Sequence, residues 1–273
     1  ANEIAGVQKR IIDVSNCKIP PKQYEQFEAE FVDFIAPKQY LKPSNMNDII
    51  DTQTKPAQRA RNVKFMEQGS GRKARVRAFQ KQEGTLKASA GRVISTLETE
   101  DIIHMGRFTA PVKSYMKKFR FFMPCRNPAE TAKMIKAYCQ NKDEIVETDY
   151  SKFDGSISPF LRNLEGKIML ACFGPDYKVE LEGLLSRDRD LTGITKSGVR
   201  YKTGSSRLSG SQMTTIGNTL INAYVAYCAY RIRRTGPVES FNRIGPKFGD
   251  DGIDHIEGDF VTAANDLGLK LKC

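Results

Sequence analysis

The chain has 273 residues, of which 40% are hydrophobic and 27% are charged, so it can bury one large core or two lobes. No apolar run reaches the roughly 18 residues of a membrane-spanning helix, and the first residues lack the apolar core of a signal peptide. The net charge of +11 indicates a polyanionic partner. Six scattered cysteines without a Cys-x-x-Cys pair, and only two histidines, argue against a zinc site and for reduced thiols.

The first predicted helix covers residues 22–35. Tyr24, Phe27 and Phe31 recur there at helical spacing, and Pro37 follows the last turn. Because these aromatic side chains fall on one side of the helix, we expect them to lie in the core.

A strongly basic segment runs from Lys55 to Arg92, where eleven Lys and Arg face two Glu, a net charge of +9. Four glycines interrupt it, which favours loops and short strands over one helix. Basic and apolar residues alternate between Arg75 and Phe79, as in a strand with one charged face. The segment is either a solvated basic surface or part of a phosphate-binding channel.

The following elements alternate between helix and strand. Asn127, Pro128 and Glu130 form a capping-box pattern that opens a helix predicted over 127–141. The other predicted elements are a strand at 144–150, a helix from Ser158-Pro159 to Gly174, a helix at 176–187, a hairpin at 192–203 that turns at 196–198, and helices at 212–234 and 258–267.

The helix at 212–234 follows the small-residue loop 205–210. Apolar residues such as Ile216 and Leu220 mark a buried side, whereas Thr214, Asn218 and Asn222 form a polar row at four-residue spacing. The polar row is therefore a candidate binding face.

Two adjacent carboxylates, Asp250 and Asp251, lie between glycines in a predicted hairpin turn. Such a pair is electrostatically costly unless a cation is bound, although Asp-Asp beside Gly is also common in ordinary surface turns. Asp149 ends the predicted strand at 144–150. If the two strands are neighbours, Asp149 and Asp250 can hold two divalent cations about 4 Å apart, as in-line displacement at phosphorus requires. A site with few carboxylates, completed by phosphate oxygens, favours Mg²⁺.

The chain resembles viral RNA-dependent RNA polymerases of positive-strand RNA viruses at three motifs, called A, B and C, which here read Asp149-x4-Asp154, Ser209-Gly210-x3-Thr214-x3-Asn218 and Gly249-Asp250-Asp251. Residues 148–155 and 248–252 are most similar to the nodavirus and tombusvirus-like enzymes. Residues 76–83 and 91–95 resemble the basic fingertip motif F. The resemblance covers roughly residues 70–272 and implies template-directed RNA synthesis in viral genome replication, by nucleotidyl transfer from a nucleoside triphosphate to an RNA 3′-OH.

The resemblance also implies a fold, an α/β right-hand polymerase core with an antiparallel palm sheet flanked by helices. Residues 1–143 would form the N-terminal region and fingers, and residues 144–273 the palm, with a fingers insertion at about 175–205. Motif E and the thumb have no counterpart in this stretch. The motif D region begins at 268, where Lys270 is the candidate general acid.

Specific residues receive roles from the same resemblance. Asp149, Asp250 and Asp251 would be the catalytic, metal-binding carboxylates, with Asp251 an auxiliary one near the primer end. Asp154 and Asn218 would contact the ribose of the incoming nucleotide, where the 2′-OH distinguishes RNA from DNA precursors. The ordinary alternative is that Asp154 is a turn residue and that Thr214 and Asn218 only satisfy contacts of their helix.

The remaining nucleotide-binding candidates come from motifs B and F. Ser209 and Gly210 would form a flexible loop near the templating base, and Thr214 would support the ribose-sensing pair. Lys81 and Arg92 would hold the triphosphate. Many neighbouring cations compete with these two for that role.

The resemblance implies Mg²⁺, with Mn²⁺ a possible substitute, and RNA template, RNA product and nucleoside triphosphates as partners. No membrane segment is expected in this stretch, and oligomers would form through regions outside it. Replication would take place in the host cytoplasm at membrane-associated complexes. Two alternatives stay open, a reverse transcriptase-like polymerase and a non-catalytic RNA-binding module.

Overall fold

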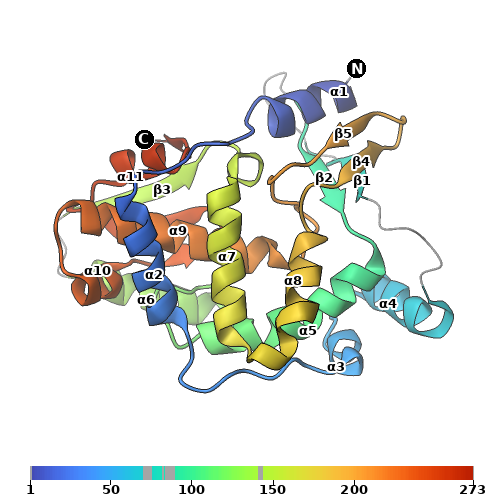
Figure 1. Ribbon diagram of the computed structural model, residues 1–273, viewed down its shortest axis with the longest axis horizontal. Coiled ribbons are helices and arrows are strands. Elements are labelled where there is room, and N and C mark those ends of the chain that lie inside the picture. Colours follow the sequence, from blue (N-terminus) through green and yellow to red (C-terminus); the bar gives the residue numbers. More distant parts are fainter. Residues whose placement is uncertain (1, 70–75, 82, 84–89, 141–143, 273) are drawn as a thin grey trace.

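The computed structural model describes residues 2–69, 76–81, 83, 90–140 and 144–272. In these residues the fold is a mixed α/β arrangement of helices and two separate four-stranded sheets (Figure 1). The longer helices are α2 (Gln23–Ile35), α4 (Pro56–Gln68), α5 (Thr99–Met116), α6 (Pro128–Cys139), α7 (Pro159–Cys172), α8 (Lys178–Ser186) and α9 (Met213–Ile232). The shorter ones are α1 (Asn2–Val7), the π-helix η1 (Gln8–Ile12), α3 (Met46–Asp51), the 3₁₀ helices η2 (Phe153–Ser156) and η3 (Pro175–Tyr177), α10 (Pro237–Arg243) and α11 (Phe260–Asp266).

The first sheet has the strand order β6 (Lys247–Phe248), β7 (Asp251–His255), β3 (Ile145–Tyr150) and β8 (Leu271–Lys272). Each neighbouring pair is antiparallel. The strand predicted at 144–150 and the predicted hairpin are both confirmed. The turn itself is Gly249–Asp250, and Asp251 is already the first residue of β7. This sheet matches the expected antiparallel palm sheet, so we call it the palm sheet.

The second sheet, which we call the fingers sheet, has the order β2 (Val93–Thr96), β1 (Val76–Gln80), β4 (Thr192–Thr195) and β5 (Arg200–Lys202). Strand β1 pairs antiparallel with β2 and parallel with β4. The predicted hairpin at 192–203 is therefore confirmed, and it extends a sheet begun by the N-terminal half. The domain boundary at 143/144 and the insertion at 175–205 stay predictions.

Helix α9 lies at the centre of the core. Every residue from Ile216 to Tyr230 is buried, so the helix is enclosed on both its apolar and its polar side. Helix α2 packs on it through Phe31, whose ring centroid lies 5.4 Å from that of Tyr224 and 5.6 Å from that of Tyr227. The predicted core role of the α2 aromatic residues is confirmed. In Figure 1, α2 and α7 cross in front of α9, and the fingers sheet lies on the opposite side of α7 from the palm sheet.

Local capping explains why two helices begin where the sequence predicts. The Asn127 side chain accepts from the Glu130 amide at 2.8 Å, and Glu130 accepts from the Asn127 amide at 3.3 Å. The Ser158 hydroxyl accepts from the Leu161 amide at 3.3 Å at the start of α7. The helix that begins at Asn127 was predicted to end at Asn141, which lies outside the described residues.

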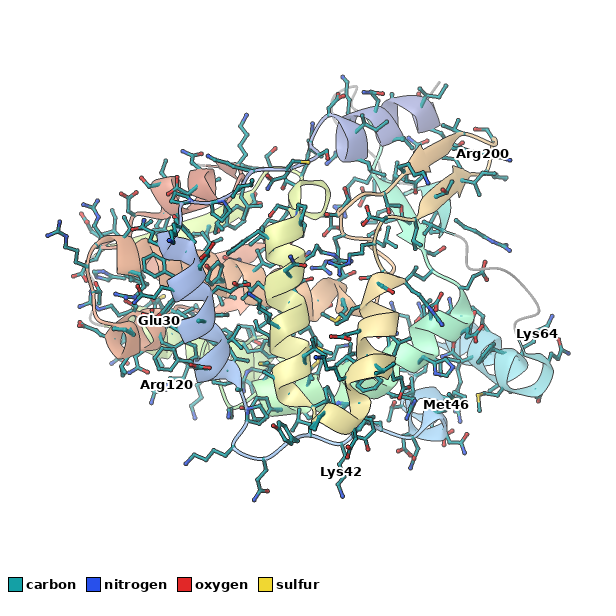
Figure 2. The ribbon with its side chains drawn as sticks, in the orientation of Figure 1. Glu30, Lys42, Met46, Lys64, Arg120 and Arg200 are labelled. Atoms are coloured by element: carbon teal, nitrogen blue, oxygen red, sulfur yellow. The ribbon has the colours of Figure 1, made fainter. Side chains whose placement is uncertain are left out.

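The expectation of loops and short strands through the whole basic segment is wrong for its first third, which forms α4. Pro56 occupies the first turn, and no glycine or second proline occurs before Gly69, whose positive φ of 67° ends the helix. The exposed Lys64 projects outward from α4 (Figure 2). The predicted strand start at Arg75 lies outside the described residues, as do Arg72, Lys73 and Lys87.

Helix α5 was not predicted, because Pro111 interrupts its sequence pattern while the structure keeps the helix continuous to Met116.

Within the described residues, no helix combines the length and the apolarity needed to cross a membrane.

Candidate active site

A cavity of about 360 Å³ is lined by residues of both sheets and of α9. Most of the predicted site residues line it: Asp149, Asp154, Asp250, Arg92, Ser209, Thr214 and Asn218. These residues come from segments up to 158 positions apart in the chain, so the fold, not the local sequence, brings them together. Asp251, Gly210, Lys81 and Lys270 are not among the residues that line this cavity.

The acidic centre of the cavity is built by strand pairing. In the palm sheet Thr148 is opposite Gly252, which sets the end of β3 beside the turn that carries Asp250. Gly249 has a φ of +65°, a conformation that glycine adopts without strain, as predicted for this turn. Burial raises the pKa of Asp251, and the nearby charges of Asp250 and Asp149 raise it further. The negative charges of Asp149 and Asp250 therefore both act on the Asp251 carboxyl.

Asp251 faces a different space from Asp250. It lines a neighbouring cavity of about 310 Å³ together with Asp149, Thr148 and Phe248. Asp149 thus belongs to both cavities and lies at the boundary between them. The place of Asp251 in the neighbouring cavity is compatible with its expected role as an auxiliary carboxylate.

Side chains of helix α9 bind the main chain of the acidic turn. The Gly249 amide donates to the Thr219 hydroxyl at 2.9 Å, and the Asn222 side chain donates to the Gly249 carbonyl at 3.2 Å. The Asn222 amide oxygen lies 3.5 Å from the Tyr150 hydroxyl on β3. One member of the polar row predicted on this helix, Asn222, therefore positions the turn, and Thr219 was missed because it lies outside the four-residue spacing.

A buried ion pair lies beneath the same turn. Lys247 is fully buried in β6, where its ammonium pairs with Asp254 and lies 3.2 Å from the Thr148 hydroxyl. Burial lowers the pKa of Lys247, and the charge of Asp254 opposes that effect. A Cβ on Gly252 would lie 2.6 Å from the Lys247 Nζ. Gly252 is thus required for packing of the lysine, whereas the sequence suggested a turn residue.

Asp154 and Asn218 form a direct pair in the cavity, with the Asn218 Nδ2 donating to the Asp154 Oδ1 at 2.7 Å. Burial raises the pKa of Asp154, while the hydrogen bond from Asn218 and the charge of Arg207 lower it and the charge of Asp250 raises it. Asp154 lies in η2, after Lys152, whose φ of 55° is uncommon for a residue with a Cβ. Asp154 therefore lies in a turn and also pairs with Asn218, and its expected contact with a ribose stays a prediction.

The loop before α9 is fixed against the fingers sheet. The Ser209 hydroxyl accepts from the Ser95 amide at 3.2 Å, and the Gly210 amide donates to the Ser95 carbonyl at 2.9 Å. A Cβ on Gly210 would lie 2.9 Å from that carbonyl oxygen, which requires a residue without a side chain. Thr214 donates to the Leu208 carbonyl at 2.9 Å and so closes the loop onto the helix.

The two predicted triphosphate ligands differ in position. Arg92 lines the cavity, whereas Lys81 does not, and both pair with Glu83. Lys152 and Arg10 also line the cavity and add positive charge that the motifs did not reveal. Arg10 in particular comes from the N-terminal helix η1, which no sequence pattern connected with the site.

Lys272 is a site residue that sequence reasoning missed. Strand β8 pairs Lys272 with Asp149, and its Nζ lies 2.7 Å from the Asp149 Oδ2. Lys270, the predicted general acid, has an exposed side chain, and its carbonyl accepts from the Ser151 amide at 2.8 Å. The two-residue strand β8 is too short to leave a periodic signal.

The donor atoms around the cavity suit a hard cation. Its lining residues supply carboxylate, amide and hydroxyl oxygens and include no His or Cys. In the described part of the chain, no group of three or more His, Cys, Asp or Glu side chains is arranged to hold a metal by protein ligands alone. Asp149 and Asp250 supply the carboxylate oxygens of this cavity, a donor type that hard divalent cations prefer.

Comparisons with known proteins agree with this geometry. The sequence model of viral RNA-dependent RNA polymerases matches residues 40–272. The chain belongs to this family. The RNA-directed RNA polymerase of striped jack nervous necrosis virus is 34% identical in an alignment that covers 100% of this chain and 29% of that protein. Those of Pariacoto virus and Flock house virus are 30% and 29% identical and cover 99% and 98% of this chain.

The chain spans about three tenths of the length of these curated relatives. The sequence identities to these relatives confirm the predicted resemblance to nodavirus polymerases. Among solved structures, the RNA-dependent RNA polymerase of a human picobirnavirus superposes with a TM-score of 0.77 at 15% identity, over 99% of this chain and 56% of that chain. This likeness supports the predicted right-hand polymerase fold.

Proposed function

We propose that this chain contains the catalytic centre of a template-directed RNA polymerase, which transfers a nucleoside monophosphate from a triphosphate to an RNA 3′-OH and releases pyrophosphate. The observation that carries the proposal is a single cavity lined by Asp149, Asp250 and the hydrogen-bonded pair Asp154–Asn218. Such a cavity brings carboxylates for cations beside a polar pair suited to a sugar. The family supports the same activity.

In this proposal Asp149 and Asp250 would hold Mg²⁺, or Mn²⁺ in its place, and Asp251 would add charge near the primer end. Cations held there would supply activation of the attacking oxygen and charge neutralisation for the leaving group. The chain itself contributes a turn fixed by Thr219 and Asn222, which keeps Asp250 beside the end of β3. Positioning of this kind is a main part of catalysis in phosphoryl transfer.

The nucleotide would lie between the acidic centre and the fingers sheet. Asp154 and Asn218 would bind its ribose, and Arg92, Lys152 and Arg10 would face its triphosphate across the same cavity. Lys81, which does not line the cavity, would contact the triphosphate from the edge of the cavity. Ser209, Gly210 and Thr214 would hold the loop that approaches the templating base.

RNA template, RNA product and nucleoside triphosphates are the proposed partners. We further propose that the protein works in genome replication inside the host cell, as the viral polymerases it resembles suggest, and that replication takes place on membrane-associated complexes in the cytoplasm. Lys270 and Lys272 are both proposed candidates for a proton donor to pyrophosphate, and Lys272 has the additional support of its contact with Asp149.

The test is RNA-templated incorporation of ribonucleotides by the full polymerase chain and by its Asp250→Ala variant, in Mg²⁺ and in Mn²⁺. Loss of a metal ligand should reduce incorporation by about 10³-fold or more. Asp176→Ala, at an exposed aspartate away from the cavity, is the matched control. Full incorporation by Asp250→Ala contradicts the proposal. Preference for deoxynucleotides would indicate a reverse transcriptase, and RNA binding without any synthesis a non-catalytic module.

A further inference from the structure

Four charged side chains form a buried cluster directly behind the ribose-binding pair. Arg162 and Glu165 come from α7, Asp188 from the segment after α8, and Arg207 from the loop before α9. Their side chains are 0–4% exposed. None of the four belongs to a predicted motif, and charged side chains are rarely buried this completely unless they are paired.

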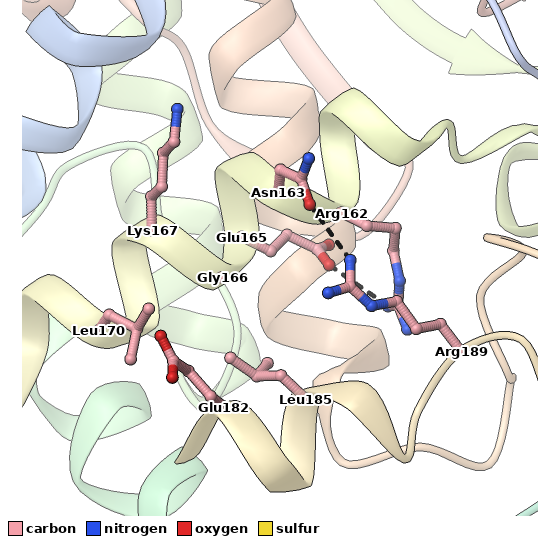
Figure 3. Close-up of a pocket in the computed structure, with 9 residues that line it drawn as sticks. All are labelled: Arg162, Asn163, Glu165, Gly166, Lys167, Leu170, Glu182, Leu185 and Arg189. Carbon is pink, nitrogen blue, oxygen red and sulfur yellow. Dashed lines mark hydrogen bonds and ion pairs between the residues drawn. The ribbon is translucent and has the colours of Figure 1, made fainter. Parts of the chain in front are cut away.

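The cluster lies between two cavities. Arg207 lines the candidate active site, whereas Arg162 and Glu165 line a separate cavity of about 380 Å³ between α7 and α8. Figure 3 shows Arg162 and Glu165 side by side on α7, joined by their ion pair. The cluster is thus part of the wall behind the active site.

Positive and negative groups alternate in the cluster. Arg162 pairs with Glu165 at 3.3 Å and with Asp188 at 2.9 Å, and Arg207 pairs with Glu165 on its other side. The net charge is zero, which reduces the cost of burying four ions. A Cβ on Gly217 would lie 2.5 Å from a terminal nitrogen of Arg207. Gly217 therefore makes room for the guanidinium directly before Asn218.

Arg207 also contacts the ribose-binding pair itself. Its Nε donates to the Asn218 Oδ1 at 3.1 Å, while the Asn218 Nδ2 donates to Asp154. A guanidinium can only donate and an ionised carboxylate can only accept, so the Asn218 amide has one allowed orientation between them. The Arg207 amide additionally donates to the Asp154 carbonyl at 2.7 Å. Both members of the pair are therefore fixed by the same residue.

We propose that Arg207 is a positioning residue for sugar recognition, an inference that rests on the proposed polymerase function. It locks the Asn218 amide with its NH₂ group toward Asp154, which leaves the remaining acceptor capacity of the Asp154 carboxylate for a sugar hydroxyl. Glu165 pairs with the Arg207 guanidinium and holds it in place, and an Asp188 carboxylate oxygen lies 3.9 Å from it. A substrate without the 2′-OH then leaves a desolvated, preoriented polar group unpaired, which is the kind of site that discriminates strongly.

The decisive variant is Arg207→Lys in the full polymerase chain. Lysine keeps the cluster neutral, but its single ammonium cannot bind Glu165 and also replace the Nε donor to Asn218. We expect kcat/KM for ATP relative to 2′-deoxy-ATP to fall by about tenfold. Arg189→Gln, at an exposed contact with Asn163 outside the cluster, should leave the ratio unchanged.

If Arg207 has a merely structural role, Arg207→Lys would lower kcat/KM equally for ATP and 2′-deoxy-ATP. The ratio would then stay unchanged, and this result overturns the inference. If Arg207→Lys does not fold, the double variant Arg207→Gln/Glu165→Gln removes one charge of each sign and carries the same expectation. The side-chain amide of Asn218 gives a readout that needs no synthesis. Its NMR signal should lose protection from hydrogen exchange in either variant, and unchanged protection contradicts the proposal. If the wild-type chain makes no RNA, the polymerase assignment fails while this signal still decides whether Arg207 positions Asn218.

Discussion

Replacing Lys247 by methionine should weaken the fold at the point where the acidic turn begins. The Lys247 ammonium is fully buried and is paired with Asp254, whose other oxygen accepts from the Gly245 amide at 3.1 Å. Methionine fills similar space but leaves the buried carboxylate without its cation. Breaking a buried ion pair on one side costs about 3–5 kcal/mol, so we expect the free energy of unfolding to fall by about that amount.

A second substitution separates charge from packing. In Lys247→Met/Asp254→Asn the asparagine can still accept from Gly245 and neither member of the pair is charged, so most of the loss should be recovered. Urea unfolding followed by circular dichroism measures both variants, with the exposed Lys178→Met as control. A loss below about 1 kcal/mol in the single variant, or a double variant no more stable than the single, would refute the proposed support of the turn.

Three other substitutions test neighbouring parts of the site. Lys272→Met removes an exposed cation that competes with Mg²⁺ for Asp149. The free energy of unfolding should change by less than about 1 kcal/mol, while the Mg²⁺ concentration that half-saturates incorporation should fall several-fold. An unchanged Mg²⁺ dependence contradicts this. Gly210→Ala should displace the loop from the Ser95 carbonyl and lower kcat about tenfold or more, and a wild-type kcat would show that the loop tolerates the methyl group. Asp154→Asn should raise Tm at pH 7. Burial raises the pKa of Asp154, so ionisation costs stability as the pH rises through the folded pKa, and the gain should vanish toward roughly pH 4.

Where local chemistry dictates structure, the sequence was sufficient. The caps at Asn127 and Ser158 define helix starts by hydrogen bonds between near neighbours, and both form as expected. The turn at Gly249 and the strand that carries Asp149 were likewise evident from glycine and apolar patterning. Strand pairing then followed from one assumption, that β3 and the hairpin are neighbours, which the palm sheet confirms.

What could not be predicted depends on contacts between distant segments. Arg207 and Glu165 are 42 positions apart and look like surface charges until the fold buries them together. Lys272 meets Asp149 only because a two-residue strand completes the palm sheet. Helix α4 was missed for a local reason, since the glycines later in the basic segment obscured a glycine-free run before Gly69. Charge composition indicated phosphate binding but not which cations line the cavity.

The central claim, that Asp149 and Asp250 share divalent cations with a bound nucleotide, is tested most directly by anomalous diffraction. The full polymerase chain would be crystallised with RNA, a non-hydrolysable ribonucleotide triphosphate and Mn²⁺ in place of Mg²⁺. We expect anomalous peaks within about 2.1 Å of carboxylate oxygens of both Asp149 and Asp250, with the triphosphate completing the coordination. A bound nucleotide whose metal contacts neither carboxylate would contradict the assignment.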